Sequence, residues 1–316
     1  MKIVIVGYGE MFNALITGVL NSGHEIAGVF RKENILYSPF RRLVYDWIMP
    51  SEDRLFVKSL GLNDIKAESV NSDKFIEEIK RLNTDIILVG SWGEKFSSKI
   101  IASPKIACIN THPSLLPKYR GANPYAQVIL AGEKYSGITF HIMDENFDTG
   151  PVIHQAEVKI SDYETGKSLK QKCCELARKE IVSLLKSFDE KIQIPIKQNE
   201  KLATYQKQLT LEDCILNFSE ESSVKIQRRI RALTPWLKCH IPYKNEFFEF
   251  KKFTVYDNKV DFEPASIIKK TSNSIFIVCA DRKIIEFSGL KLKRFLLLPF
   301  TKFYLKYFIK INSKAI

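Results

Sequence analysis

The first half of the chain alternates short apolar runs with stretches of helical spacing. Uninterrupted apolar runs lie at residues 3–6, 26–30, 86–89 and 106–109, and apolar positions recur at helical spacing over 73–82. Runs without polar alternation are typical of strands that are buried on both faces, as in parallel sheets. We therefore predict an α/β domain with a Rossmann-like, parallel-rich sheet.

The pattern changes in the second half of the chain. Strand-like runs continue at 138–143 and 152–156, and one apolar stripe predicts a helix over 165–187. The periodicity lapses around 190–210, which indicates a domain boundary. Beyond it, short alternating runs follow a helix predicted at 222–233, with the spacing of a small antiparallel barrel.

These patterns divide the chain into four parts. We expect an α/β domain that carries the chemistry at 1–190, a linker at 191–207, a C-terminal barrel-like domain of OB type at 208–292, and a basic tail at 293–316.

The sequence excludes several classes of protein. No stretch approaches the roughly 20 uncharged apolar residues of a spanning helix, and the first apolar run is too short for a signal peptide, so we expect a cytoplasmic protein. The six cysteines are scattered without CxxC spacing, which predicts buried, reduced thiols and no metal site.

Positive charge is concentrated in the C-terminal part of the chain. Residues 1–200 carry 26 basic and 25 acidic side chains, whereas residues 201–316 carry 22 basic and 11 acidic ones. This asymmetry favours a polyanionic partner such as RNA, a nucleotide diphosphate or an anionic membrane surface. A general lysine bias of the source proteome is the alternative interpretation.

Two polar clusters follow predicted strands. The run N-T-H-P-S-L-L-P-K-Y-R-G occupies residues 110–121, and D-E-N-F-D-T-G occupies residues 144–150. The carboxyl ends of strands in such sheets form the ligand crevice, so an amide, an imidazole and a carboxylate can meet there. This set suits acyl transfer to an amine: Asn110 would donate a hydrogen bond to the developing oxyanion, and His112, polarised by Asp148, would stabilise it and help move protons.

The same clusters contain no recognisable covalent nucleophile. Without a Ser or Cys at a nucleophile elbow, direct attack by the acceptor amine is favoured. Taken singly, each polar residue has a structural explanation, such as a turn cap or an ordinary loop. We interpret the remaining histidines as structural, namely His24, His141, His154 and His240.

The spacing of these motifs resembles the formyltransferase family that uses 10-formyltetrahydrofolate. The resemblance rests on residues 110–121, on L-A-G at 130–132 with G-I-T at 137–139, and on D-T-G at 148–150. It implies that Asn110, His112 and Asp148 are catalytic. It also implies that the folate lies between the strand end at 88–92 and the loop at 142–148, with contacts from Leu88, Ser91, Trp92, Ser114, Leu115, Leu116, Pro117, Ile142 and Asp144.

The resemblance continues through I-R-A-L-T-P-W at 230–236 to about residue 292, which is typical of family members with a barrel domain. It implies that the acceptor is either methionyl-initiator tRNA, which we favour, or an amino sugar linked to UDP or dTDP. The sequence departs from the tRNA enzymes in lacking their basic P-A-G-R-G-K-K-L loop and in having S-W-G at 91–93. We expect acceptor contacts from Arg41, Arg42, Arg120 and Asn123.

Two further functions stay open at this point. A hydrolase that discharges formyltetrahydrofolate to water would use the same three residues but would leave the second domain unexplained. A catalytically inactive RNA-binding or membrane-associated module would not need all three.

The tail has a composition of its own. Residues 291–314 carry seven basic side chains and no acidic one, interleaved with aromatics. A basic amphipathic helix would lie on an anionic membrane as a peripheral contact or bind RNA. The alternative is a tail that packs on its own barrel.

Overall fold

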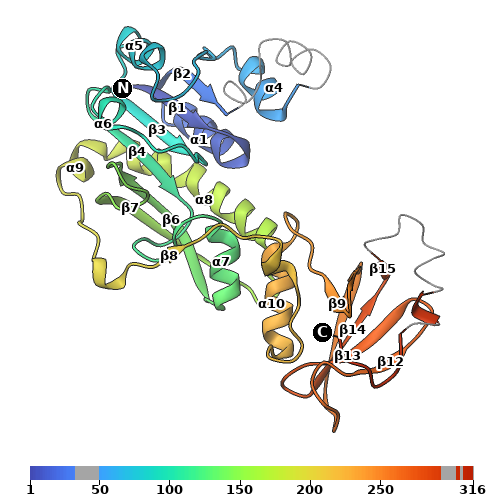
Figure 1. Ribbon diagram of the computed structural model, residues 1–316. Coiled ribbons are helices and arrows are strands. Elements are labelled where there is room, and N and C mark those ends of the chain that lie inside the picture. The colour runs from blue at the N-terminus through green and yellow to red at the C-terminus, as the bar shows by residue number, and fades with distance from the viewer. Residues whose placement is uncertain (33–49, 293–303, 307–308, 316) are drawn as a thin grey trace. The chain divides into compact units, whose positions relative to one another are not determined.

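The computed structural model describes residues 1–32, 50–292, 304–306 and 309–315 (Figure 1). The chain forms two compact units. The first comprises residues 1–128, 134–161 and 168–207, and the second comprises residues 129–133, 162–167 and 208–316. Each unit therefore has its own core, and the second takes up two short segments, 129–133 and 162–167, that interrupt the sequence of the first.

A six-stranded sheet in the order β2-β1-β3-β4-β6-β7 forms the centre of the first unit (Figure 1). The first four strands in that order are parallel, β6 is antiparallel to β4, and β7 is antiparallel to β6. The predicted apolar runs form strands of this sheet. Their lack of polar alternation fits burial on both faces, since Val4, Ile5 and Val6 have no exposed surface. The strands are β1 (Lys2–Gly7), β2 (Glu25–Arg31), β3 (Ile86–Gly90), β4 (Ala107–His112), β6 (Tyr135–Ile142) and β7 (Val152–Lys159).

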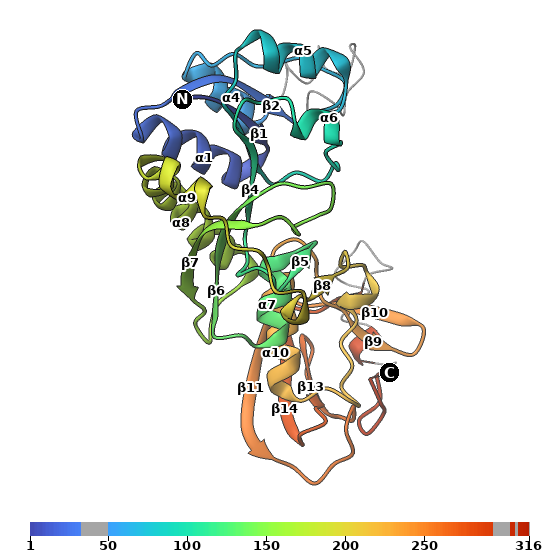
Figure 2. The same ribbon diagram turned by 90° about the vertical axis from the view of Figure 1, so that its left-hand side faces the viewer.

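Helices cover both faces of this sheet (Figure 2). On one face, Phe75, Ile79 and Ile100 join the core from α5 (Asp73–Arg81) and α6 (Ser98–Ile101). On the other face lie α1 (Gly9–Asn21) and α8 (Gly166–Lys186). The two helices pack so closely at Gly18 that a Cβ atom there would lie 2.2 Å from the side chain of Ile181. The smaller elements are α4 (Glu52–Ser59), β5 (Arg120–Gly121), α7 (Pro124–Ala131), α9 (Phe188–Gln193), η1 (Glu200–Leu202) and β8 (Tyr205–Gln206).

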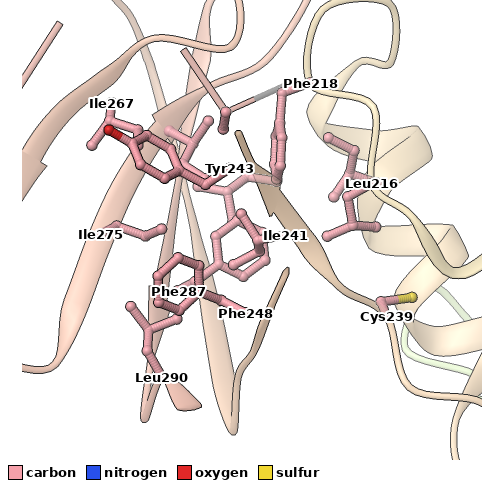
Figure 3. Packing of buried hydrophobic residues seen from close by; sticks show 14 of the residues in the cluster. Leu216, Phe218, Cys239, Ile241, Tyr243, Phe248, Ile267, Ile275, Phe287 and Leu290 are labelled. Atoms are coloured by element: carbon pink, nitrogen blue, oxygen red, sulfur yellow. The ribbon is translucent and has the colours of Figure 1, made fainter. Parts of the chain in front are cut away.

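The second unit contains two antiparallel sheets around one apolar core (Figure 3). Tyr243, Phe248 and Phe287 are among its largest buried side chains. Its elements are η2 (Glu212–Cys214), α10 (Ser223–Leu233), β9 (Ile241–Tyr243), β10 (Glu246–Glu249), β11 (Lys252–Lys259), β12 (Ile267–Lys270), β13 (Ser274–Val278), β14 (Lys283–Ser288) and β15 (Lys291–Leu292). The predicted fold class, a Rossmann-like domain followed by an antiparallel barrel-like domain, is confirmed.

The described part of the tail does not form the predicted amphipathic helix. Lys291 and Leu292 form β15 at the end of the barrel-like domain, and of the described residues after them 304–306 alone are helical. Leu305 and Ile309 are buried in the core of the second unit, where the amine of Lys270 donates to the carbonyl oxygens of both residues. Leu305 and Ile309 therefore pack within the protein, as the alternative interpretation expects of the tail, whereas Ile311 is exposed.

The six cysteines all lie in the described part of the chain, are buried and form no disulfide, as predicted. Among the described residues, no helix is both long enough and apolar enough to span a membrane.

Candidate active site

Two of the predicted catalytic side chains stand at the end of β4. The strand extends two residues beyond the predicted end at Asn110 and so includes His112. Asn110 and His112 point to the same face because they are two residues apart. Asp148 lies in the loop between β6 and β7, with a φ of 59°, a backbone conformation that few non-glycine residues adopt. The three residues that we expected to be catalytic therefore meet at one point.

The carboxylate of Asp148 is the centre of this group. One oxygen, Oδ1, accepts from Asn110 Nδ2 at 3.1 Å and lies 3.3 Å from His112 Nδ1. The other oxygen, Oδ2, accepts from the backbone N–H of Gly121 at 2.9 Å. Burial alone would raise the pKa of Asp148, but the charge of His112, its contact with the carboxylate, the neighbouring His141 ring and the hydrogen bond from Gly121 outweigh burial and hold that pKa well below its usual range.

His112 is held from both sides. Its Nε2 lies 2.8 Å from the carbonyl oxygen of Tyr119, and its Nδ1 faces Asp148. Because both partners can only accept, the doubly protonated ring is the form that satisfies both nitrogens. Burial opposes the charged ring, yet the Asp148 carboxylate prevails and raises the pKa of His112 above its ordinary value.

A fourth residue, His141, completes the cluster, although we interpreted it as structural from the sequence. It lies directly opposite Asn110 in the β4–β6 pairing and is 1% exposed. Its Nδ1 lies 3.0 Å from the carbonyl oxygen of Ile142, which assigns the proton to Nδ1 and leaves Nε2 to accept from Asn110 at 3.1 Å. The sequence signal was its place in a strand next to β4, but the register could not be read from the sequence.

The partners of Asn110 change its expected role. Both hydrogens of its side-chain amide are used, one by Asp148 and one by His141. No described residue donates to its Oδ1, and that atom is not among the buried unpaired ones. In this structure Asn110 therefore offers an acceptor rather than the predicted oxyanion donor, which would become available only if one of the two bonds broke.

The residues expected to contact folate fall into two groups. Leu88, Ser114 and Leu116 are at most 5% exposed, so their side chains do not line an open site. The hydroxyl of Ser114 instead donates to the carbonyl of Lys118 within its own loop. The partly exposed residues, which can line a site, are Ser91, Trp92, Leu115, Pro117, Ile142 and Asp144.

The two loops that are expected to flank the folate lie side by side. Lys95 Nζ donates to Asn146 Oδ1 at 3.4 Å, and Trp92 and Met143 pack against the same apolar cluster. The indole Nε1 of Trp92 is buried and has no partner among the described residues. A buried donor without a partner is costly, and a folate carbonyl or carboxylate group would satisfy it, so these residues fit the co-substrate.

The acceptor residues have three different outcomes. Arg41 and Arg42 lie outside the described residues. Arg120 is fully buried, and all five N–H groups of its guanidinium bond to Gln198, Glu200 and Tyr205. Its side chain is therefore not available to the acceptor in this structure, contrary to expectation. Asn123, before α7, has a φ of 55° and a buried Nδ2 without a partner in the described structure, which leaves it as a candidate.

An open cavity of about 520 Å³ lies between α1, α4 and α8. None of the four clustered residues lines it. In the described ranges, no three His, Cys, Asp or Glu side chains are placed to hold a metal ion.

Comparison with known proteins supports the resemblance. Residues 1–185 match the family model described as formyl transferase, and residues 208–297 match that of the formyl transferase C-terminal domain. A methionyl-tRNA formyltransferase of Lachnospira eligens is 28% identical over 284 residues, which are 88% of each chain. One of Thermotoga neapolitana is 30% identical over 232 residues, covering 73% of this chain and 72% of the relative.

Solved structures share the fold. The sugar 3N-formyl transferase WlaRD, solved with dTDP and 5-N-formyl-THF, matches with a TM-score of 0.65 at 18% identity, over 91% of this chain and 97% of that one. An N-formyltransferase from Helicobacter canadensis, in complex with folinic acid and dTDP-3-aminofucose, matches with a TM-score of 0.66 at 17% identity, over 91% and 99%.

Proposed function

The chain belongs to the formyltransferase family, and we propose that it transfers the formyl group of 10-formyltetrahydrofolate to the primary amine of methionyl-initiator tRNA. The observation that carries the chemistry is the cluster of Asn110, His112, His141 and Asp148 at the end of β4. 10-Formyltetrahydrofolate would supply the formyl carbon, which the amine would attack directly. The amine nitrogen would bond to that carbon, the bond from the carbon to N10 would break, and tetrahydrofolate would leave with the proton that the amine loses.

The protonated ring of His112 supports this reaction by its charge. Negative charge develops on the formyl oxygen when the amine attacks, and a fixed imidazolium in a buried site stabilises such charge strongly. The Asp148 carboxylate keeps the ring protonated and oriented. The His112 imidazolium thus supplies a positive charge that is fixed before the reaction begins, without a covalent enzyme intermediate.

Asn110 supports the reaction through its free acceptor. Its Oδ1 can accept a hydrogen from the attacking amine and so orient the nitrogen lone pair toward the formyl carbon. The predicted alternative, in which its N–H stabilises the oxyanion, requires one bond to Asp148 or His141 to break.

Two observations favour tRNA as the acceptor. The named relatives with sequence similarity are methionyl-tRNA formyltransferases. In addition, β11 and β13 carry Tyr256 and Phe276 with ring centroids 6.0 Å apart, and Lys269 Nζ lies 5.0 Å from the Phe276 ring centre. Tyr256 is exposed and Phe276 is half-buried, and aromatic rings flanked by lysine on a sheet of a basic domain are suited to nucleic-acid contact.

A nucleotide-linked amino sugar is the second candidate. Relatives of similar fold act on sugars, as their names state, and the chain lacks the basic loop that we expect of the tRNA enzymes. The active-site cluster serves either amine equally well, because none of its four side chains selects what lies behind the amine.

An acceptor panel separates the two candidates. Purified protein is given 10-formyltetrahydrofolate with either methionyl-initiator tRNA or dTDP- and UDP-linked amino sugars, and formylated product is quantified. We expect formylation of the tRNA, weakened several-fold in the variant Lys269→Glu, with Lys74→Glu on the first unit as the matched control. Formylation of sugars alone would contradict the tRNA proposal, and no formylation of any amine would contradict the transferase function.

A further inference from the structure

The segment at 196–206, here called the strap, lies against the catalytic loops. It falls between the two family matches, and the sequence predicts only a linker there. Ile196 exchanges two backbone hydrogen bonds of 2.8 Å with Val152, just after the Asp148 loop. At its other end, β8 pairs in parallel with β5. The strap is thus tied to both loops that carry the active site.

Gln198 is the central residue of the strap and is 6% exposed. Its Nε2 donates to the carbonyl oxygens of Asp148 at 2.9 Å and Gly150 at 2.7 Å. Its Oε1 accepts from Arg120 Nε at 3.1 Å and from the Arg120 Nη2 at 2.8 Å. Both donors and both acceptor positions of the amide are used, so Gln198 connects the backbone of Asp148 to Arg120.

Every N–H group of the Arg120 side chain donates a hydrogen bond to the strap. Beyond the two bonds to Gln198, its terminal nitrogens donate to the Glu200 carboxylate at 2.9 and 2.8 Å and to the hydroxyl of Tyr205. The guanidinium has five N–H groups, and each has a partner on the strap. A buried charge satisfied in this way fixes the geometry of the loop that holds it.

Thr204 binds the other partner of the catalytic ring. Its hydroxyl accepts from the N–H of Tyr119 at 2.8 Å, and its carbonyl accepts from the N–H of Arg120 at 2.9 Å. The carbonyl of Tyr119 is the group that contacts His112 Nε2. The strap therefore holds the residues that contact His112 on both sides, Tyr119 through Thr204 and Asp148 through Gln198.

We propose that the strap positions the catalytic pair, with Gln198 and Arg120 as positioning residues that keep Asp148 and the Tyr119 carbonyl on either side of His112. The expected effect of the strap on turnover rests on the proposed formyl transfer. The strap should also affect the ionisation of His112, which can be measured without any substrate.

The test compares Gln198→Met, which keeps the size but loses every hydrogen bond, with Gln171→Met, an exposed glutamine of α8, as the matched control. We expect the kcat of Gln198→Met to fall about 30-fold or more, because small displacements of catalytic groups cost up to roughly 10²-fold. The KM for the folate should change less than about threefold, since Gln198 contacts the 142–148 loop through the backbone of Asp148 and bonds to none of the side chains expected to contact folate. The control should match wild type.

A readout independent of turnover is the titration of His112, followed by NMR in the unliganded protein. We expect a lower pKa of His112 in Gln198→Met, because a displaced Asp148 stabilises the imidazolium less. Gln198→Glu keeps the acceptors for Arg120 but loses the donors to Asp148 and Gly150. If Gln198→Met does not fold, the same titration and kinetics are measured on Gln198→Glu, with the same expected results. An unchanged His112 titration together with turnover within threefold of wild type would overturn the proposal. Absence of formyl transfer by the wild-type protein would instead count against the proposed function.

Discussion

The ionisation of His112 is the property of a single residue on which the chemistry depends most. Its two nitrogens face a carbonyl oxygen and a carboxylate, and its pKa is raised. A group whose pKa is raised by folding stabilises the native state fully below its unfolded pKa, which is about 6.5 for histidine, and this contribution is lost as pH rises through the higher native value. Activity that needs the imidazolium should follow the same direction.

We therefore predict that kcat falls as pH rises through the raised pKa of His112. In Asp148→Asn the carboxylate charge is absent, the pKa of His112 drops, and the decline in kcat moves to lower pH. Rate profiles of both proteins between about pH 5 and 10 check this, with formyl transfer followed under saturating substrates. A wild-type rate that rises through that range would show that neutral His112 is the active form.

At the scale of elements, strand pairing decides which side chains join the site. The sequence predicted β4, β6 and the meeting of Asn110, His112 and Asp148, because a buried apolar run followed by unusual polar residues is a local signal. It could not predict His141, because residues 113–134 between the two strands do not fix the register, and a shift of one residue would turn His141 to the other face. For the same reason it could not foresee that Arg120 is buried against residues 78 to 85 positions away.

The pairing gives His141 a testable role. His141→Leu removes the acceptor of the Asn110 amide and should lower kcat about tenfold, because Asn110 loses its fixed orientation. His141→Gln restores an acceptor and should recover most of the rate. Steady-state kinetics of the two variants check this, and equal rates in both would show that the bond between His141 and Asn110 has no part in turnover.

At the scale of the whole molecule, the proposed active site and the excess of positive charge fall in different units. The cluster of Asn110, His112, His141 and Asp148 and the strap lie in the first unit, while the excess of positive charge lies in residues 201–316, almost all in the second. The chain pattern predicted this division, since the change from mixed to alternating periodicity is visible in the sequence. The strap was hidden because a polar, irregular segment looks like a linker until its partners are known.

The most direct test of the central claim is formyl transfer by His112→Ala beside wild type and His24→Ala, a histidine outside the cluster. The account predicts a loss of about 10²- to 10⁴-fold in kcat for His112→Ala alone, with tetrahydrofolate binding measured by calorimetry unchanged. Near-normal turnover in His112→Ala would contradict it.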